Sequence, residues 1–501
     1  MIRNARTGLK ATLLRLSRAS LGLALGAAVA VPAAAQQQSP PASKVERLNR
    51  APVSKEPLRV TLRKPVEATL DNGLTVLILE DHRLPLVNVQ FNMSGAGPLF
   101  EPPELPGLAV FTAQMLREGT KTRSSLQISQ EVDQLGAAVG ANAGFGSAAT
   151  LLTASGLSDN FEQWFALAAD LLLNATFPDE ELAKLKQRAL VGLRQQRSNP
   201  NFLLSERFSR MVYGMYPASV RSATAESVNS LTSERMAEWR NERYAPQNSI
   251  LGIAGDVDAK TLIPKLNKWL AAWKKTSLKE ELPSPPEQVK SPRIAIVDRP
   301  GSVQTDMAIG NIAIDRRSPD YYAVYVMDSV VGAGASARLF LNLRENKGYT
   351  YGVYSNFTAL KYPGPWQCGG SMRSEVTGDA MTEFLAELRR IRDEKVPAAE
   401  LAEKKQSIVA GFALSLEQPT TQLNFAMTRK IYGFPVNYWD VYPDKIMAVT
   451  ADDIQRVAQK YIPIDSLQVV AVGDASKIRS MLEKFGAIEV WDTDGKPAAK
   501  K

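Results

Sequence analysis

The sequence contains an internal repeat, and this repeat limits the folds that are open to the chain. Three landmarks recur in the same order: a proline followed by Glu-Leu-Ala, a Tyr-Gly pair, and a Gly-Asp pair after an apolar run. The repeated positions are Pro178 and Pro397, Tyr213 and Tyr432, and Gly255 and Gly473, which lie 219, 219 and 218 positions apart. The nearly constant offset indicates a duplicated unit of roughly 220 residues, so the 501 residues should form two homologous domains.

Each half begins with strand patterns and continues with helical ones. In the first half the apolar runs 74–79 and 86–91 flank a polar turn, and residues 294–297 open the second half likewise. Residues 181–197 carry apolar side chains every three or four positions, which predicts a helix that Asn199-Pro200 would end. Strands paired as hairpins in an antiparallel sheet, with helices packed on one side, predict the α+β class.

Shifts in composition mark the expected domain limits. Residues 281–293 are rich in proline and predict a linker between an N-terminal domain at 58–280 and a C-terminal domain at 294–490. A tail at 491–501 follows. Residues 36–57 are rich in Pro, Ser and Gln and predict a flexible leader.

The N-terminus has the pattern of a secretory signal peptide. Five basic residues and no acid precede an apolar stretch at 21–31, and small residues follow it up to Ala35. We expect residues 1–35 to be removed by cleavage near Ala35, which predicts a periplasmic protein. A mitochondrial presequence is the alternative, whereas the apolar run is too short for a membrane anchor.

The charge balance narrows the classes of partner. The formal net charge of +8 includes the five basic residues of the signal peptide, so the mature chain carries about +3. A charge that small over so long a chain gives no reason to expect nucleic acid or an anionic membrane as a partner. The hydrophobic content of 45% is enough for sizeable cores.

The segment Gly107–Thr120 reads GLAVFTAQMLREGT. It resembles the zinc-site helix of the pitrilysin-like (M16) metallopeptidases, whose active members carry HxxEH at five consecutive positions within it. Those positions here run from Val110 to Gln114, with Ala113 in place of the glutamate that activates water. The third zinc ligand of the family, a glutamate in a later helix, is matched by Gly192. None of these side chains replaces an imidazole ligand or a catalytic carboxylate, so the resemblance implies that this chain binds no metal and needs no cofactor.

The chain holds one histidine and one cysteine, which leaves no spare ligands of these types. His82 lies between Asp81 and Arg83 in a polar turn, and we expect it to be an ordinary surface residue. Cys368 has no partner for a disulfide, so we expect a small packing residue.

A second signature of the family is retained. Residues 337–355 read ARLFLNLRENKGYTYGVYS and resemble the M16 element in which an arginine and a tyrosine seven positions later reach into the active site. The matching residues are Arg344 and Tyr351. The resemblance implies that Arg344 holds a substrate carbonyl and that Tyr351 donates to the oxyanion. A purely structural role for both residues is the alternative.

Two glycine-rich segments also have counterparts in the family. Residues 331–336, VGAGAS, resemble its turn before the Arg/Tyr element, and they lack the Lys-Ser pair of a phosphate-binding loop. Residues 136–146 take the place of the family's substrate strand, where a peptide adds to a sheet edge. The resemblance implies that Asn142 and Ala143 contact substrate, although the neighbouring glycines weaken a strand and leave this interpretation open.

The resemblance covers nearly the whole mature chain and implies two M16-type domains that face each other like a clamshell. Loss of the first site and retention of the second are typical of a non-catalytic subunit that completes a zinc-bearing M16 partner. Zinc is then expected in the partner of an exported heterodimer that hydrolyses unfolded peptides. The alternative is an inert scaffold or peptide-binding protein of the same fold. A neighbouring reading frame with HxxEH and a degraded Arg/Tyr element would favour the first hypothesis.

Overall fold

The computed structural model describes residues 62–498, which belong to one compact unit. The predicted signal peptide and the whole of the predicted leader therefore lie outside the described residues. Among residues 62–498, every helix is too short or too polar to span a bilayer.

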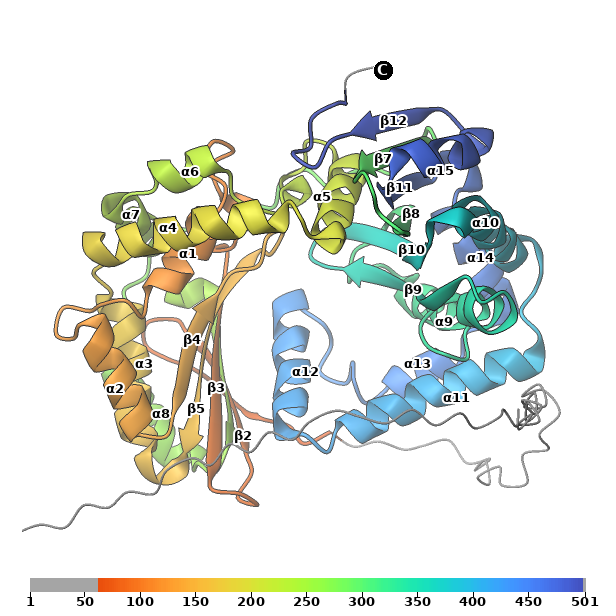
Figure 1. Cartoon of the computed structure of the whole chain (residues 1–501). Coiled ribbons are helices and arrows are strands. Elements are labelled where there is room, and N and C mark those ends of the chain that lie inside the picture. The colour runs from red at the N-terminus through yellow and green to blue at the C-terminus, as the bar shows by residue number, and fades with distance from the viewer. Residues whose placement is uncertain (1–61, 499–501) are drawn as a thin grey trace, which may run out of the picture. The chain divides into compact units, whose positions relative to one another are not determined.

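The first half is a six-stranded sheet with helices on one face (Figure 1). Its elements are β1 (Val66–Thr69), β2 (Thr75–Glu80), β3 (Leu86–Ser94), α1 (Leu108–Met115), α2 (Ser125–Gln134), β4 (Ala138–Asn142), β5 (Ala149–Leu157), α3 (Phe161–Asn174), α4 (Asp179–Gln196), α5 (Pro200–Tyr213), α6 (Ala225–Ser230), α7 (Ser233–Arg243), β6 (Ser249–Gly255) and α8 (Ala259–Trp269).

The second half repeats this plan, which confirms the duplication and the α+β class. Its elements are β7 (Arg293–Asp298), β8 (Gln304–Ile314), α9 (Tyr321–Val331), a π-helical turn (Phe340–Asn346), β9 (Thr350–Ala359), β10 (Pro363–Arg373), α10 (Thr377–Asp393), α11 (Ala398–Ser415), α12 (Pro419–Tyr432), α13 (Tyr442–Met447), α14 (Ala451–Tyr461), β11 (Gln468–Gly473), α15 (Ala475–Leu482) and β12 (Ile488–Trp491).

Both sheets are mixed, and five strands of each follow the same order. The sixth strand differs, because β1 is antiparallel to β2 whereas β12, the last strand of the chain, is parallel to β7. The first runs β1-β2-β6-β3-β5-β4 and the second β12-β7-β11-β8-β10-β9. The hairpin expected between β2 and β3 is wrong, because β6 lies between them, parallel to β2 and antiparallel to β3. β6 is almost wholly buried and takes a central place, where neighbouring strands satisfy both of its edges. Its last residue, Gly255, has φ +138°, and a Cβ there would lie 2.0 Å from the carbonyl oxygen of Leu86, so only glycine fits.

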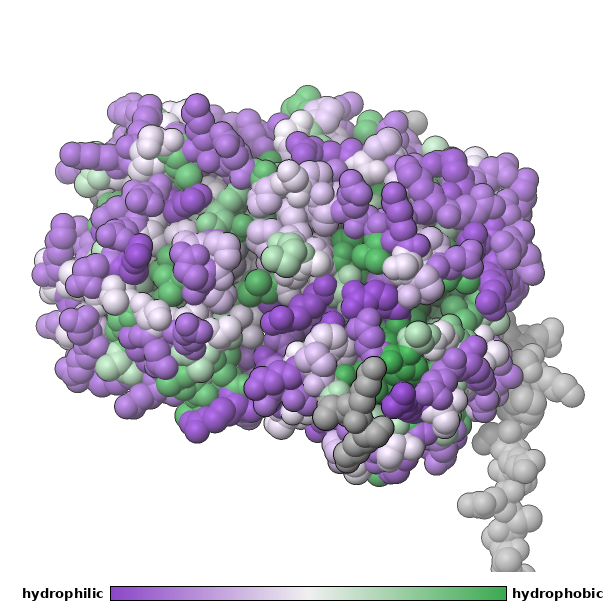
Figure 2. All heavy atoms as spheres, turned by 90° about the horizontal axis from the view of Figure 1, so that it is seen from above, coloured by the Kyte–Doolittle hydropathy of each residue, from purple (hydrophilic) through white to green (hydrophobic). Residues whose placement is uncertain are grey.

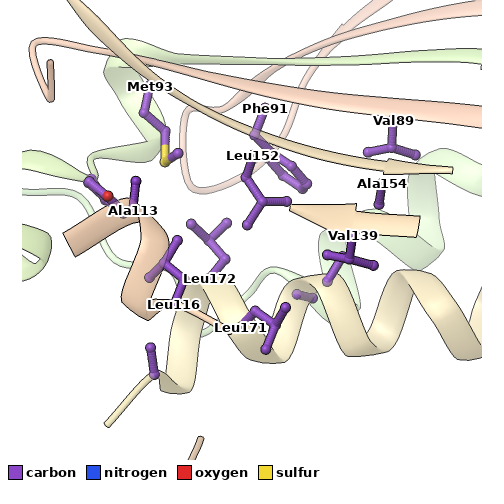
Figure 3. Close-up of a cluster of buried hydrophobic side chains, with 14 of the residues drawn as sticks. Val89, Phe91, Met93, Ala113, Leu116, Val139, Leu152, Ala154, Leu171 and Leu172 are labelled. Carbon is purple, nitrogen blue, oxygen red and sulfur yellow. The ribbon is translucent and has the colours of Figure 1, made fainter. Parts of the chain in front are cut away.

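The core of the first half lies between the sheet and the helices α1 and α3. Phe91 of β3 is fully buried, and its ring centroid lies 6.1 Å from those of both Phe165 and Trp273. Figure 3 shows the end of this cluster at which Met93 and Leu172 meet residues of α1. Burial of these aliphatic and aromatic side chains supplies most of the driving force for folding of this half.

Each half also contributes one helix to the other half. Apolar residues of α5, among them Phe208, join one cluster with Val297 of β7 and Val472 of β11. Conversely, α12 packs on β2 and β6 through residues such as Met427. Gly252 of β6 permits this approach, because a Cβ there would lie 2.5 Å from Sδ of Met427. The other face of each sheet is therefore covered in part by a helix from the opposite half, as α12 is seen to do in Figure 1.

The start of α5 differs from the sequence-based expectation. Residues 181–197 do form a helix, α4, which ends at Gln196. Asn199-Pro200 begins the next helix rather than only ending this one, since the Asn199 side chain accepts from the backbone N–H groups of Asn201 and Phe202. Asparagine at the N-cap and proline at the first position are a common helix start.

Candidate functional site

Helix α1 occupies the position of the lost zinc motif. Its N-terminus is held by Glu101, whose carboxylate accepts hydrogen bonds from the backbone N–H groups of Gly107 (2.8 Å) and Ala109 (2.6 Å). Seven of the eight residues of α1 are buried, so this helix is fixed mainly by core packing.

The residues at the motif positions do not fit a zinc ion. Ala113 is 1% exposed and lies in the apolar cluster of Figure 3 beside Met93 and Leu116, where a glutamate would have no polar surroundings. Val110 is buried, and Gln114 is the exposed residue of the helix. Gly192 in α4 has no side chain to offer. The side chains at these four positions therefore do not provide the imidazole and carboxylate ligands that catalytic zinc requires.

Glu101 gives α1 a pH-dependent contribution to stability. Burial raises the pKa of this carboxyl from 4.5 to about 7, although the backbone N–H groups of α1 oppose the rise. A folded-state pKa above the unfolded one means that the contribution is fully present below pH 4.5 and is lost as the pH rises through 7.

We expect Glu101→Gln to remove this dependence, because the amide stays neutral, while its one oxygen keeps one of the two hydrogen bonds from the backbone N–H groups. Relative to wild type, the free energy of unfolding of the variant should rise by about 1–3 kcal/mol between these pH limits. Urea denaturation of both proteins at several pH values in that range measures the difference. A difference that does not change with pH would contradict this assignment.

Arg344 and Tyr351 line one cavity of about 380 Å³ in the second half. It is also lined by Gln304 at the start of β8 and Arg373 at the end of β10. None of the described residues around this cavity comes from α1 or α4, where the zinc positions lie. Arg344 and Tyr351 therefore line the same cavity, and this cavity is separate from the degenerate zinc positions on α1 and α4.

Tyr351 is placed by a β-bulge at the start of strand β9. Thr350 pairs with Met372 and Gly352 with Ser371, which leaves Tyr351 as the extra residue on its strand. The Thr350 hydroxyl donates its one hydrogen to the carbonyl oxygen of either Ser371 or Gly352 and accepts from the Gly352 N–H, so it stabilises the bulge. Bulges commonly redirect a side chain, and the Tyr351 side chain is directed into solvent with 91% exposure.

Arg344 lies in the π-helical turn Phe340–Asn346. Its guanidinium forms an ion pair with Glu345 and lies 4.8 Å from the ring centroid of Phe340. Single π-helical turns occur often at functional sites. The side chain is 43% exposed, so a substrate carbonyl could replace Glu345 as its partner.

Asn142 and Ala143 lie at a free sheet edge. β4 is the outer strand of the first sheet, and its last residue, Asn142, pairs with Leu151 of β5 and is exposed. Ala143 is buried at 2% exposure and points into the core instead. β9, which carries Tyr351, is the equivalent outer strand of the second sheet. Both sheets thus offer one edge to which an extended peptide could add.

A larger cavity, of about 740 Å³, is lined by residues of both halves. Its walls come from β3, the loop after β4, α5, the β9–β10 connection and α12. Sequence reasoning missed this cavity, because its lining residues come from segments far apart in the chain. The one local signal was the glycine-rich segment 136–146, whose residues Gly144 and Gly146 form part of the wall.

The one histidine and the one cysteine of the chain lie outside both cavities described above. The His82 side chain is 60% exposed and its Nδ1 lies 2.7 Å from Asp256 Oδ1, a hydrogen bond that raises the pKa of the imidazole. Cys368 is buried in β10, and this burial raises the pKa of its thiol. The expectations of a surface histidine and a packing cysteine are confirmed.

Comparison with known proteins matches both halves of the chain. The family profile described as insulinase (peptidase family M16) matches residues 81–223, and the profile described as peptidase M16 inactive domain matches residues 230–408. A Rickettsia bellii protein named as an uncharacterized zinc protease is 26% identical over 409 residues, which cover 78% of this chain and 93% of the relative.

Solved structures agree with these matches. The peptidase M16 inactive domain from Pseudomonas fluorescens superposes with a TM-score of 0.76 at 25% identity, over 82% of this chain and 98% of that one. The periplasmic protease PqqL from Escherichia coli gives a TM-score of 0.69 at 15% identity, over 85% of this chain and 48% of that one. The arrangement of the two halves is therefore shared with these proteins.

Proposed function

Because the chain belongs to peptidase family M16, we propose that it is the non-catalytic subunit of an exported heterodimeric zinc peptidase that hydrolyses unfolded peptides. In this proposal Arg344 and Tyr351 act at the zinc ion of a partner subunit. Arg344 holds a carbonyl of the substrate, and Tyr351 donates to the oxyanion that forms during attack on the peptide bond.

One observation carries the proposal. Arg344 and Tyr351 share a cavity to which α1 and α4 contribute none of the described lining residues, while Val110, Ala113 and Gln114 on α1 supply no zinc ligand or base. Retention of the pair without a metal site in the same chain fits a function in which the pair completes another subunit.

Exposed apolar side chains near this cavity support contact with a partner. Val303, next to the cavity residue Gln304, is 76% exposed, and Leu341 in the π-helical turn is 45% exposed. The face of the molecule shown in Figure 2 is mainly polar, with apolar side chains scattered over it.

The periplasm is the proposed location. The support consists of the signal-peptide pattern of residues 1–35 and the fold shared with a periplasmic protease of Escherichia coli. The partner is then an exported M16 subunit with an intact HxxEH helix.

We expect the purified mature chain to bind no stoichiometric zinc and to hydrolyse no peptide alone. The physical reason is the absence of imidazole and carboxylate groups at the four ligand and base positions, Val110, Ala113, Gln114 and Gly192. Elemental analysis and a fluorogenic peptide assay measure both properties. One zinc ion per chain together with activity that a chelator removes would overturn the proposal.

The heterodimer is tested by co-expression with a zinc-bearing M16 subunit from the same genome. We expect the two chains to elute together in size-exclusion chromatography and the mixture to gain peptidase activity. Separate elution under all conditions, with no gain in activity on mixing, would contradict the assignment of a partner.

A scaffold or peptide-binding protein without a role in hydrolysis is the second candidate. The ion pair between Arg344 and Glu345 favours it, because this contact occupies the guanidinium that substrate would need. The two candidates separate in the Glu345→Gln variant, which frees Arg344. The peptidase subunit should keep or gain activity with its partner, whereas the scaffold should show none in either form.

A further inference from the structure

The cavity of about 740 Å³ between the two halves has an unusual balance of charge. Its lining includes two cationic residues, Arg221 and Lys361, and no carboxylate. Lys361 is neutralised by Glu280, to which its Nζ donates at 2.7 Å. Arg221 forms no ion pair and no side-chain hydrogen bond with any residue of the described part of the chain. Arg221 is exposed to solvent at the cavity, and its positive charge has no counter-charge among the described residues.

Two tyrosine side chains lie near this arginine. The Tyr362 hydroxyl, buried at 3% exposure, donates to the Gly146 carbonyl at 2.6 Å. The Arg221 guanidinium lies on the same side, since a methyl group on Gly146 would be 3.7 Å from its Nη1 and 3.2 Å from the Tyr362 hydroxyl oxygen. Burial raises the pKa of Tyr213, and the positive charge of Arg221 partly opposes that rise. Arg221, Tyr213 and Tyr362 therefore form one polar corner of the cavity.

The remaining polar lining consists of serine, threonine and tyrosine hydroxyls and of side-chain amides. Gln90, Gln367 and Asn424 all line the cavity, and their side chains make no hydrogen bond within the described residues. A primary amide can both donate and accept, which suits the backbone of a peptide rather than one particular side chain. The volume is of the order of that of known ligand sites, about 300–1,000 Å³.

The cavity continues from the free edge of β4. Asn142 ends this strand, and residues 144–149 directly after it form part of the cavity wall. An extended peptide that adds to the edge of β4 and passes its end would therefore approach the corner that holds Arg221.

We propose that this cavity binds a carboxylate group of an unfolded peptide through Arg221, with the free amides holding the peptide backbone. This proposal rests on the proposed function for the nature of the ligand, a peptide. It adds a selectivity for acidic peptides, or for a peptide C-terminus, over basic ones. An arginine fork binds a carboxylate by two charge-assisted hydrogen bonds, whereas a basic side chain meets an uncompensated positive charge.

The test measures peptide binding by the full mature chain without a partner, so that it does not depend on catalysis. The peptides are fluorescently labelled, unstructured and of one length, and they differ only in the C-terminal group and one internal residue. They carry a free C-terminal carboxylate, a C-terminal amide, or an amide together with internal glutamate, glutamine or lysine. We expect peptides with a carboxylate to bind about tenfold more tightly than their amide counterparts in a fluorescence anisotropy titration. Preference for the free C-terminus alone or for internal glutamate identifies the source of the carboxylate.

Three variants locate the effect. Arg221→Gln should reduce the preference to less than about twofold. Glu280→Gln releases Lys361 into the cavity and should tighten binding of acidic peptides. Arg188→Gln is the matched control, because Arg188 is an exposed arginine on α4 outside the cavity, and it should leave the preference unchanged.

Equal binding of acidic and amidated peptides, a preference for lysine peptides, no measurable binding of acidic peptides, or an unchanged preference in Arg221→Gln would each overturn the proposal. A different result would refute only the proposed function: the isolated chain prefers acidic peptides, but no zinc-bearing partner gains peptidase activity from it.

Discussion

Replacing Tyr351 by phenylalanine is expected to lower kcat of the complex with a zinc-bearing partner by a factor on the order of 10²–10³, or roughly 3–4 kcal/mol. Phenylalanine keeps the ring, and the side chain is 91% exposed, so the change costs little stability and deletes only the phenolic donor. The loss appears in the chemical step, because the oxyanion exists only in the transition state. Steady-state kinetics of the mixed complex measure this loss, and size-exclusion analysis checks that the complex still forms.

Tyr354→Phe is the matched control for this variant. Tyr354 lies on the same strand, β9, is half exposed, and packs its ring 5.8 Å from that of Phe340. We expect its kcat to stay within about twofold of wild type, a change far below the loss of an oxyanion donor. If Tyr351→Phe also stays within about twofold, only the scaffold function is left. Arg344→Ala should differ from both variants by raising KM, since the arginine is assigned to substrate positioning.

Truncation of Phe208 to alanine is expected to destabilise the whole chain by about 3–5 kcal/mol. Phe208 is 3% exposed in α5, yet its apolar neighbours include residues of β7, β8 and β11 in the other half. The cavity left behind would therefore weaken the contact through which the first half holds the second. Urea denaturation followed by tryptophan fluorescence measures the change.

Met215→Ala is the control for Phe208→Ala. Met215 follows α5 by two positions and is 98% exposed, so its truncation should change the free energy of unfolding by less than about 0.5 kcal/mol. A loss for Phe208→Ala as small as that of the control would show that the exchanged helix contributes little to the association of the halves.

The repeat in the sequence predicted the most general property of the fold. Gly255 and Gly473 end equivalent central strands, β6 and β11, and their constant offset reflects the same place in two equal sheets. The pairing of those strands was not predictable from local pattern. β6 inserts between β2 and β3 although it follows them by more than 150 residues, so the short polar turn between β2 and β3 falsely suggested a hairpin.

The exchange of α5 and α12 between the halves also escaped prediction. An amphipathic pattern states that one face of a helix is buried, but it does not state which sheet buries it. Asn199-Pro200 was interpreted as the end of a helix. In the structure Asn199 is the N-cap of α5 and Pro200 is its first residue. Gly252 allows α12 to pack closely on β6. Its sequence context did not predict this role, because the residue that it contacts, Met427, lies 175 positions away.

The candidate site was predictable in part through the resemblance to the family. The motif supplied Arg344 and Tyr351, and the structure places both at one cavity. The motif did not predict the bulge at Tyr351, which depends on the register between β9 and β10. Arg221 had no motif at all, because its place beside Tyr362 and Gly146 depends on packing between the two halves.

The most direct test of the central claim is a titration of a zinc-bearing M16 subunit with this chain, with hydrolysis of an unfolded peptide as the measured quantity. We expect neither protein to be active alone, and activity to rise with added chain until the two are present in equal amounts. The same titration with the Tyr351→Phe chain should reach a plateau lower by a factor on the order of 10²–10³. Full activity of the zinc subunit without this chain, or no activity at any ratio, would contradict the claim that this chain supplies Arg344 and Tyr351 to a partner.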